Sequence, residues 1–316
     1  MDTHPVSAGR DVSGVSDRAA PATHVVFTGG PSPTSAEALA LSSRLARTRI
    51  SRAVAADSGL DMADCLGSGD PVVAVQMVIG DMDSVDPARL AQAASDGIEV
   101  ERFPTDKDAT DLELALDEIA AAASVGDRIV VLGTTSGRFD HVLATLLVLA
   151  SPAYAAFDRE AWLGLEVIHV VTGSAAAPSD AGTSLDLAAG TTLSILAVHG
   201  DAVVSVSGVR WPLHDEVLAA GTSRGVSNIA VGGDESSESG DGRPGDGGVV
   251  VSVRSGTVMV VVPGDQPVAS SPDGTVSTVS TVCNSTDSNS TDSNSTDSNS
   301  TDSTDIDSTE IQEERR

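Results

Sequence analysis

The sequence predicts an α/β fold in which a Rossmann-like domain with a mostly parallel sheet is followed by a smaller antiparallel β-sandwich domain. Strand-like and helix-like segments alternate over residues 23–164, an order that is typical of a parallel sheet covered by helices. Over residues 165–264, short β-prone runs follow one another with turn residues between them, which favours an antiparallel sandwich or barrel. Residues 1–22 are polar and residues 265–316 are of low complexity, so we expect both segments to be disordered.

The strands expected in the α/β domain are short runs of apolar or alternating residues, bounded by glycine, proline or polar residues. Valine, isoleucine and alanine dominate most of them, as expected for strands that are buried inside a parallel sheet. In chain order, these strands are His24–Phe27, Val54–Ala56, Val72–Ile79, Ile98–Phe103 and Arg128–Leu132.

The helices between these strands are predicted from apolar residues at helical spacing and from residues that commonly begin a helix. Pro87 suits the first turn of a helix. Thr110 and Glu113 fit a capping box, which predicts a helix that begins at Asp111. In chain order, the expected helices are Ser35–Arg47, Leu60–Leu66, Pro87–Ala94, the helix from Asp111 and Val142–Ala150.

The second domain is predicted from β-prone runs alone, because no helical pattern separates them. Turn residues lie between the runs, as expected for an antiparallel arrangement. The expected strands are Val167–Val171, Thr192–Val198, Ala202–Val206, Gly225–Asn228, Val249–Val253 and Val258–Val262.

Polar residues follow each expected strand of the α/β domain, at the point where the strand ends. Ligands of parallel α/β sheets bind beyond the carboxyl ends of the strands, so one topology would bring these polar residues to a single edge. The residues expected there are Gly29, Gly30, Asp57, Asp81, Asp83, Asp106, Lys107, Asp108, Asp111, Arg138 and Asp140.

The stretch from Gly80 to Val85 places two carboxylates, Asp81 and Asp83, directly after an expected buried strand. Two neighbouring acids repel each other unless solvent or a cation compensates their charge. Aspartate oxygens are hard ligands that suit Mg²⁺. Taken alone, the stretch fits a turn that merely closes the strand at least as well.

The other charges of this edge indicate a nucleotide triphosphate bound with Mg²⁺. An edge this acidic would repel a bare polyphosphate, whereas a bridging cation would allow one to bind, with Lys107 and Arg138 contacting phosphate oxygens. The sequence contains neither a Walker motif nor a Gly-x-Gly-x-x-Gly motif followed by a suitable acid. This disfavours a P-loop nucleotidase and a nicotinamide-dependent dehydrogenase.

The net charge of the 316-residue chain is −28, from 18 basic and 46 acidic residues. This charge argues against binding to nucleic acid or to an anionic membrane surface. The chain shows no signal-peptide pattern at its start and no apolar run of the roughly 18 residues that span a bilayer. We therefore expect a cytoplasmic protein that is not attached to a membrane.

Four blocks of the sequence resemble the thiamin pyrophosphokinase family, in that family's order. They are Gly80–Ser84, Asp106–Leu116, Gly137–His141, and Trp211-Pro212-Leu213 followed by Gly225–Asn228. The resemblance covers about residues 23–263. It implies an enzyme that uses Mg²⁺ and converts ATP and thiamin to AMP and thiamin diphosphate. It also implies a homodimer with active sites at the subunit interface.

The resemblance also implies roles for individual residues. Trp211, Ser227 and Asn228 would contact thiamin. An indole face suits the cationic, aromatic thiamin, although a tryptophan of the β-domain core would explain Trp211 equally well without the resemblance. Asp81, Asp83 and Asp111 would hold Mg²⁺ and act in catalysis with Arg138. The nucleotide site would be lined by Gly29, Gly30, Asp57, Lys107, Asp108, Thr110, Arg138 and Asp140.

Two other functions fit the same scaffold. One is a diphosphokinase that acts on another small alcohol, such as a pterin. The other is a regulator that binds a nucleotide or thiamin without catalysis. The acids at the edge of the sheet favour an enzyme over the regulator, and the acceptor alcohol distinguishes the two enzymes.

Overall fold

The computed structural model of the chain describes residues 20–66, 73–173, 182–231 and 248–264. The two segments predicted to be disordered lie outside these residues, except for residues 20–22. Ala22 accepts a hydrogen bond from the amide of Arg128 and donates one to Asp127, so it is tied to the start of a strand. No helix in the described part of the chain is long and apolar enough to cross a membrane.

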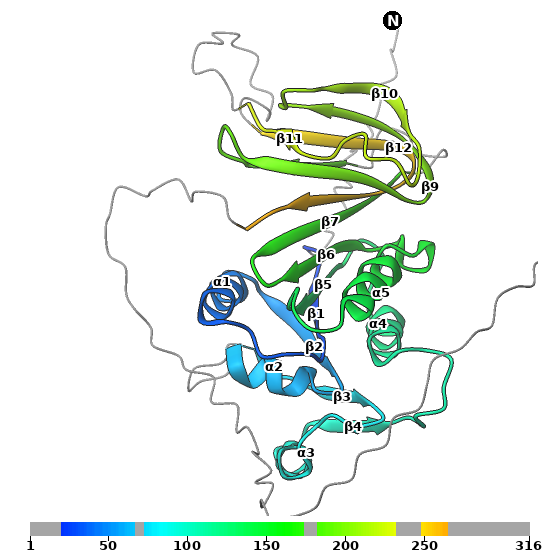
Figure 1. Ribbon diagram of the computed structural model, residues 1–316. Coiled ribbons are helices and arrows are strands. Elements are labelled where there is room, and N and C mark those ends of the chain that lie inside the picture. Colours follow the sequence, from blue (N-terminus) through cyan, green and yellow to red (C-terminus); the bar gives the residue numbers. More distant parts are fainter. Residues whose placement is uncertain (1–19, 67–72, 174–181, 232–247, 265–316) are drawn as a thin grey trace, which may run out of the picture. The chain divides into compact units, whose positions relative to one another are not determined.

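The first half of the structure is an α/β sheet in which six strands lie parallel in the order β6-β5-β1-β2-β3-β4 (Figure 1). This confirms the predicted fold class. The strands are β1 (Thr23–Phe27), β2 (Ile50–Ala56), β3 (Met77–Gly80), β4 (Glu99–Arg102), β5 (Arg128–Gly133) and β6 (Asp158–Leu163). The helices are α1 (Ser35–Leu45), α2 (Gly59–Leu66), α3 (Pro87–Ser95), α4 (Asp111–Ala122) and α5 (Phe139–Leu149), followed by a short 3-10 helix (Pro152–Tyr154).

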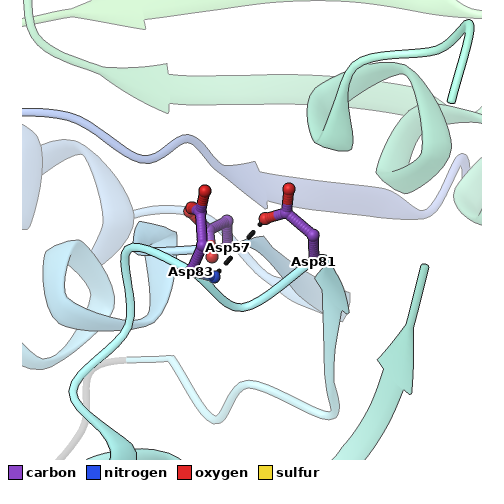
Figure 2. Close-up of side chains that lie close together, drawn as sticks. All are labelled: Asp57, Asp81 and Asp83. Carbon is purple, nitrogen blue, oxygen red and sulfur yellow. Dashed lines mark hydrogen bonds between the residues drawn. The ribbon is translucent and has the colours of Figure 1, made fainter. Parts of the chain in front are cut away.

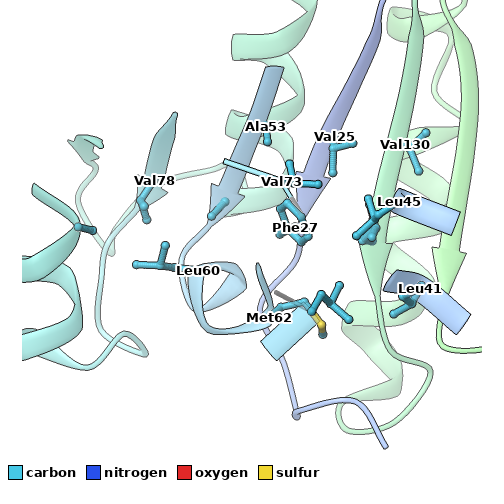
Figure 3. Packing of buried hydrophobic residues seen from close by; sticks show 14 of the residues in the cluster. Val25, Phe27, Leu41, Leu45, Ala53, Leu60, Met62, Val73, Val78 and Val130 are labelled. Atoms are coloured by element: carbon cyan, nitrogen blue, oxygen red, sulfur yellow. The ribbon is translucent and has the colours of Figure 1, made fainter. Parts of the chain in front are cut away.

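Helices cover both faces of this sheet because its strands are apolar on both sides. Side chains of α1, α2 and α3 pack on one face, where Phe27, Leu41 and Leu60 belong to one buried cluster (Figure 3). Side chains of α4 and α5 pack on the other face, in a second buried cluster. The loop after β3 contributes Met82 and Val85 to the first cluster, which anchors the segment that carries Asp81 and Asp83.

Local sequence signals fix where the helices begin. Thr110 caps α4, and its hydroxyl accepts a hydrogen bond from the amide of Glu113 at 3.2 Å, as predicted. Pro87 lies in the first turn of α3 behind the cap Asp86. The helix expected from Val142 begins earlier, at Phe139, with Arg138 as its first flanking residue.

The second half is antiparallel and has a core of its own. Its long strands β9 and β12 pair with each other and bend near Gly200 (φ 123°) and Gly256 (φ 83°), where the sequence predicted two separate strands each. The strands are β7 (Glu166–Gly173), β8 (Gly182–Leu185), β9 (Thr192–Ser207), β10 (Leu213–Leu218), β11 (Asn228–Ile229) and β12 (Val249–Val262).

The two halves share one sheet, because β7 pairs antiparallel with β6 on one side and with β12 on the other. The predicted domain boundary after residue 164 falls in the turn between β6 and β7. The division into an α/β domain and a β-sandwich domain stays a proposal, and hydrogen bonding of the sheet continues across it.

Several predicted elements differ from the structure. The strand expected from Val72 begins only at Met77, and Val73 instead packs into a core cluster. The strands β6, β8 and β10 were not predicted. In β6 the apolar pattern is interrupted by Arg159 and Glu160, which are charged yet buried, because Thr172 of β7 and Arg128 of β5 bond to them from the neighbouring strands.

Candidate active site

Three aspartates meet at the carboxyl edge of the parallel sheet (Figure 2). Asp57 follows β2, and Asp81 and Asp83 follow β3, the neighbouring strand. One carboxylate oxygen of each lies within 4.8 Å of the others. The backbone amide of Asp83 donates a 3.4 Å hydrogen bond to Asp81 Oδ1, which holds the Asp81 side chain against the backbone of this loop. The three carboxylates could share one cation.

Backbone geometry brings these acids together. Asp57 (φ 49°) and Met82 (φ 63°) adopt the left-handed conformation, and Gly80 has a φ of 150°. A Cβ atom at Gly80 would lie 2.9 Å from the carboxyl carbon of Asp111 and 3.3 Å from the Cβ of Asp57. Position 80 therefore needs glycine, both for its backbone conformation and for the close approach of Asp111.

Asp57 is held in an environment that disfavours its charge. The residue is 9% exposed, and its Oδ1 atom has no hydrogen-bond partner among the described residues. Burial raises the pKa of Asp57, and the charges of Asp111 and Asp83 add to the rise, against hydrogen bonds from Ser84 and the amide of Ser58. A buried carboxylate oxygen without a partner is costly unless a ligand binds it.

Lys107 compensates part of this negative charge. Its Nζ atom lies 3.1 Å from Asp111 Oδ1 and 3.6 Å from Asp81 Oδ2. Burial acts to raise the pKa of Asp81, but the amide of Asp83 and the ammonium of Lys107 outweigh it and hold the pKa below its usual value. Burial acts to lower the pKa of Lys107, and its bonds to Asp111 and Asp81 raise it overall. Asp81 and Lys107 are therefore both charged at neutral pH.

The family resemblance grouped Asp111 with Asp81 and Asp83 as metal ligands, and Asp57 was expected in the nucleotide site. In the structure it is Asp57 that shares the three-carboxylate cluster, and Asp111 lies beside it as the partner of Lys107. Lateral pairing of β2 and β3 sets this arrangement, which the order of residues along the chain does not reveal.

The remaining residues predicted for the nucleotide site lie on loops of the same edge. A Cβ at Gly29 would lie 2.5 Å from the hydroxyl of Ser58, so the loop of Gly29 and Gly30 after β1 runs against the loop after β2. Thr110 is occupied as the cap of α4, and Asp108 is exposed.

Arg138 and Asp140 form an exposed ion pair at the start of α5. The Nη2 atom of Arg138 lies 2.5 Å from Asp140 Oδ2, and the guanidinium lowers the pKa of that carboxyl. Both side chains are mostly exposed, so the pair is free to reorganise when an anion binds.

Trp211 lies in the antiparallel half, beside a cavity of about 490 Å³. Trp211 is 54% exposed, which contradicts the alternative of a core tryptophan. Besides Trp211, the cavity is lined by Arg210, Pro212, Leu213, Arg224, Gly225, Val226 and Asn228. Two of the three residues predicted to bind thiamin therefore line one cavity.

The side chain of Asn228 forms hydrogen bonds with the backbone of Trp211. Its Oδ1 atom accepts the amides of Trp211 (3.1 Å) and Ile229 (2.9 Å), and its Nδ2 atom donates to the carbonyl of Trp211 (2.8 Å). The side chain is buried and its hydrogen bonds are used within the protein. Ser227 (φ 61°) is not among the residues that line the cavity, and its amide donates to Ser194.

Sequence reasoning missed two residues of the cavity, Arg210 and Arg224. The signal for Arg210 was its place directly before Trp211. Its guanidinium carbon lies 5.3 Å from the centroid of the indole. Arg224 forms an ion pair with Glu216.

Comparisons with known proteins agree with this architecture. The family model described as the thiamin pyrophosphokinase catalytic domain matches residues 46–159, and the vitamin B1 binding domain of thiamin pyrophosphokinase matches residues 182–239. No curated protein matches the chain at a significant level.

Solved structures share the fold at low sequence identity. The thiamine pyrophosphokinase from Bacillus subtilis is 19% identical with a TM-score of 0.58, over 77% of this chain and 100% of that one. The thiamin pyrophosphokinase from Geobacillus thermodenitrificans is 20% identical with a TM-score of 0.55, over 77% of this chain and 97% of that one. The yeast thiamin pyrophosphokinase is 12% identical with a TM-score of 0.56, over 78% of this chain and 88% of that one. The two family matches together span more than half of the 316 residues, and the chain belongs to the thiamin pyrophosphokinase family of enzymes.

Proposed function

We propose that the protein transfers the diphosphate group of ATP to the hydroxyl group of thiamin, with Mg²⁺, and releases thiamin diphosphate and AMP. The observation that carries this proposal is the cluster of Asp57, Asp81 and Asp83 beside Lys107, at the ligand-binding edge of a parallel sheet. Family membership supports thiamin and ATP as the substrates.

The donor set of this cluster fits Mg²⁺. All three groups are carboxylates, the hard oxygen ligands that this ion prefers, and one buried oxygen of Asp57 has no other partner in the described chain. Asp57, Asp81 and Asp83 would hold the ion, with Asp111 close by. When bound, Mg²⁺ would neutralise charge on the phosphate oxygens and on the leaving group.

Residues around the cluster would bind and orient the nucleotide. Lys107 is kept charged by Asp81 and Asp111, so its ammonium can contact a phosphate oxygen. Arg138 can exchange Asp140 for a phosphate and bind it through two parallel hydrogen bonds. The hydroxyl of thiamin would then give its proton to an aspartate of this edge and attack the β-phosphorus in line, and AMP would leave with the electrons of the broken P–O bond.

The cavity beside Trp211 would bind thiamin. The exposed indole offers a face for the positively charged, aromatic substrate. Asn228 would hold Trp211 in place through its two bonds to the backbone of that residue. Ser227 would contribute through its left-handed backbone, which shapes the loop between Gly225 and Asn228.

We further propose that two copies of the chain assemble each active site. In the sheet order, five strands separate β2, which leads to Asp57, from β9, the strand that pairs with β10 and β11 beside the Trp211 cavity. At about 4.8 Å per strand, the six steps amount to a path of roughly 29 Å along the sheet, so the acidic edge and the cavity of one chain lie on well-separated strands. A partner subunit that brings its cavity to the acidic edge would complete the site.

An exposed apolar face on α5 supports such a homodimer. Phe139, Leu143 and Leu147 follow at intervals of four residues and are 74%, 45% and 40% exposed. They begin directly after Arg138, at the same edge as the proposed nucleotide site. Apolar patches of this kind are typical of surfaces that a partner covers.

The reaction is tested by incubating the protein with ATP, Mg²⁺ and thiamin and resolving the products by chromatography. We expect AMP and thiamin diphosphate in equal amounts, and neither without Mg²⁺. If AMP forms only with another alcohol, such as a pterin, then that alcohol and not thiamin is the substrate. Nucleotide binding without AMP formation from any acceptor would contradict the enzyme and favour a regulator.

The shared site is tested by mixing two inactive variants, Asp81→Asn and Trp211→Ala, under conditions that allow subunits to exchange. Random exchange in a two-fold symmetric dimer would restore about one quarter of the wild-type activity, because one site of each mixed dimer has both intact residues. No recovery, together with complete exchange measured by mass spectrometry, would contradict a site built from two chains. The cytoplasmic location expected from the sequence stays a prediction.

A further inference from the structure

The cavity beside Trp211 carries a positive charge that nothing in its lining neutralises. Arg210 and Arg224 line it, and none of its lining residues is acidic. Glu216 forms an ion pair with Arg224, whereas Arg210 has no carboxylate partner among the residues that the structure describes. The guanidinium of Arg210 instead lies 5.3 Å from the centroid of the Trp211 ring.

This charge is unfavourable for thiamin and favourable for its phosphorylated product. Thiamin is itself a cation, so a guanidinium over the same indole opposes its binding. Adding a diphosphate reverses the net charge of the ligand, and a guanidinium binds phosphate oxygens through two parallel hydrogen bonds. The backbone of Arg210 is fixed by a bond from its amide to Ile229, but its side chain is exposed and can turn toward a ligand.

We propose that Arg210 binds the diphosphate group of thiamin diphosphate and makes this cavity bind the product more tightly than thiamin. This inference rests on the proposed thiamin site. It assigns Arg210 a role in specificity and predicts that the product, when it accumulates, competes with the substrate for the Trp211 cavity. The enzyme would then slow as thiamin diphosphate accumulates.

The test is a fluorescence titration with thiamin and with thiamin diphosphate, in Mg²⁺ and without nucleotide. The chain has two tryptophans, and Trp162 is buried, so quenching by a ligand reports on the exposed Trp211. The variants are Arg210→Gln and, as a matched control, Arg254→Gln. Arg254 is an exposed arginine of the same half that lies outside the cavity lining and pairs with Asp215.

The wild type and Arg254→Gln should bind thiamin diphosphate about tenfold more tightly than thiamin, as expected for one charge-assisted phosphate contact. Arg210→Gln should lose that preference and leave the thiamin affinity unchanged or higher, and product inhibition of AMP formation should weaken to the same extent. An unchanged preference in Arg210→Gln, or an equal loss for both ligands, would overturn the role of Arg210. A wild type that binds neither ligand would overturn the thiamin site itself and this inference with it.

Discussion

Two buried aspartates at opposite edges of the parallel sheet show how differently the fold treats the same side chain. Asp127, before β5 at the amino edge, accepts hydrogen bonds from the amides of Ser124 and Ala22 and lies 3.2 Å from His24 Nε2. Those amides, with His24, hold its pKa below the usual value. Asp57, after β2 at the carboxyl edge, keeps an oxygen without a partner in the described chain, and its pKa is raised by burial.

The difference distinguishes a structural carboxylate, Asp127, from Asp57, which we propose binds a cation. At the amino edge, the carboxylate of Asp127 accepts hydrogen bonds from the protein itself, as buried polar groups normally do. The carboxyl edge gathers Asp57, Asp81 and Asp83 at a cost in stability. A site that binds a cation is expected to carry such a cost, because the ligand supplies the missing compensation.

The largest effect should come from removing a charge at the carboxyl edge. Asp81→Asn should lower kcat/KM for thiamin diphosphate formation by about 10²–10³-fold, because it would remove one of the proposed ligands of Mg²⁺. Asp127→Asn, the same chemical change at the amino edge, should keep activity within about twofold at a temperature where the protein is folded. Steady-state rates of AMP formation compare the two, and equal losses would erase the distinction between the edges.

Gly80→Ala tests whether the carboxyl edge depends on its backbone. The new Cβ would be 2.9 Å from the Asp111 carboxyl group, and alanine tolerates a φ of 150° poorly. We expect a loss of about 1–3 kcal/mol of stability and a clear fall in activity. Gly97→Ala is the control, because Gly97 also has a positive φ (88°) but open space around it. If Gly97→Ala lowers activity as much, strain alone explains the result.

Asp127→Asn should destabilise the protein by about 1–3 kcal/mol at pH 7, because an amide cannot replace both acceptor oxygens of the carboxylate. The sign of its pH dependence follows from the lowered pKa. Asp127 stabilises the folded state above its unfolded pKa of about 3.9, and this contribution is lost as the pH falls through the lower folded value. Urea unfolding of the wild type and Asp127→Asn from pH 7 to pH 3 should show that the difference between their free energies of unfolding shrinks at acidic pH. A difference that stays constant with pH would contradict this.

Much of the carboxyl edge was predictable from the sequence. Strand order and polarity place residues such as Asp57, Asp81 and Asp83 after neighbouring parallel strands, and the structure has them there. The sequence could not predict which of these acids lie next to one another in space. Lys107 and Asp111 are only four residues apart, but the approach of Lys107 to Asp81 depends on how α4 and the loop before it lie against β3, which no local pattern encodes.

The strands β6 and β10 were not predicted for a related reason. In β6, the buried Glu160 bonds to Arg128 and Trp162, and in β10, Glu216 pairs with Arg224. Such residues look like exposed loop positions until their partners are known. Asn228 was expected to contact the substrate, and its hydrogen bonds to Trp211 become visible only when β11 is placed beside that residue.

The most direct test of the central claim is a thermal unfolding series of the wild type and Asp57→Asn at pH 7, with and without Mg²⁺. A raised pKa means that the folded state gains stability as the pH falls and loses it as the pH rises through that pKa, so at pH 7 the charge of Asp57 is a cost. Without metal, Asp57→Asn should therefore melt about 2–4 °C higher, as expected for about 1 kcal/mol.

With saturating Mg²⁺ the order should reverse. The wild type should gain about 2.7 kcal/mol at a hundredfold excess over its Kd, and Asp57→Asn should gain little. A variant that is less stable than the wild type without metal, or that gains as much from Mg²⁺, would show that Asp57 is a structural carboxylate like Asp127 and would contradict the assignment of the metal site.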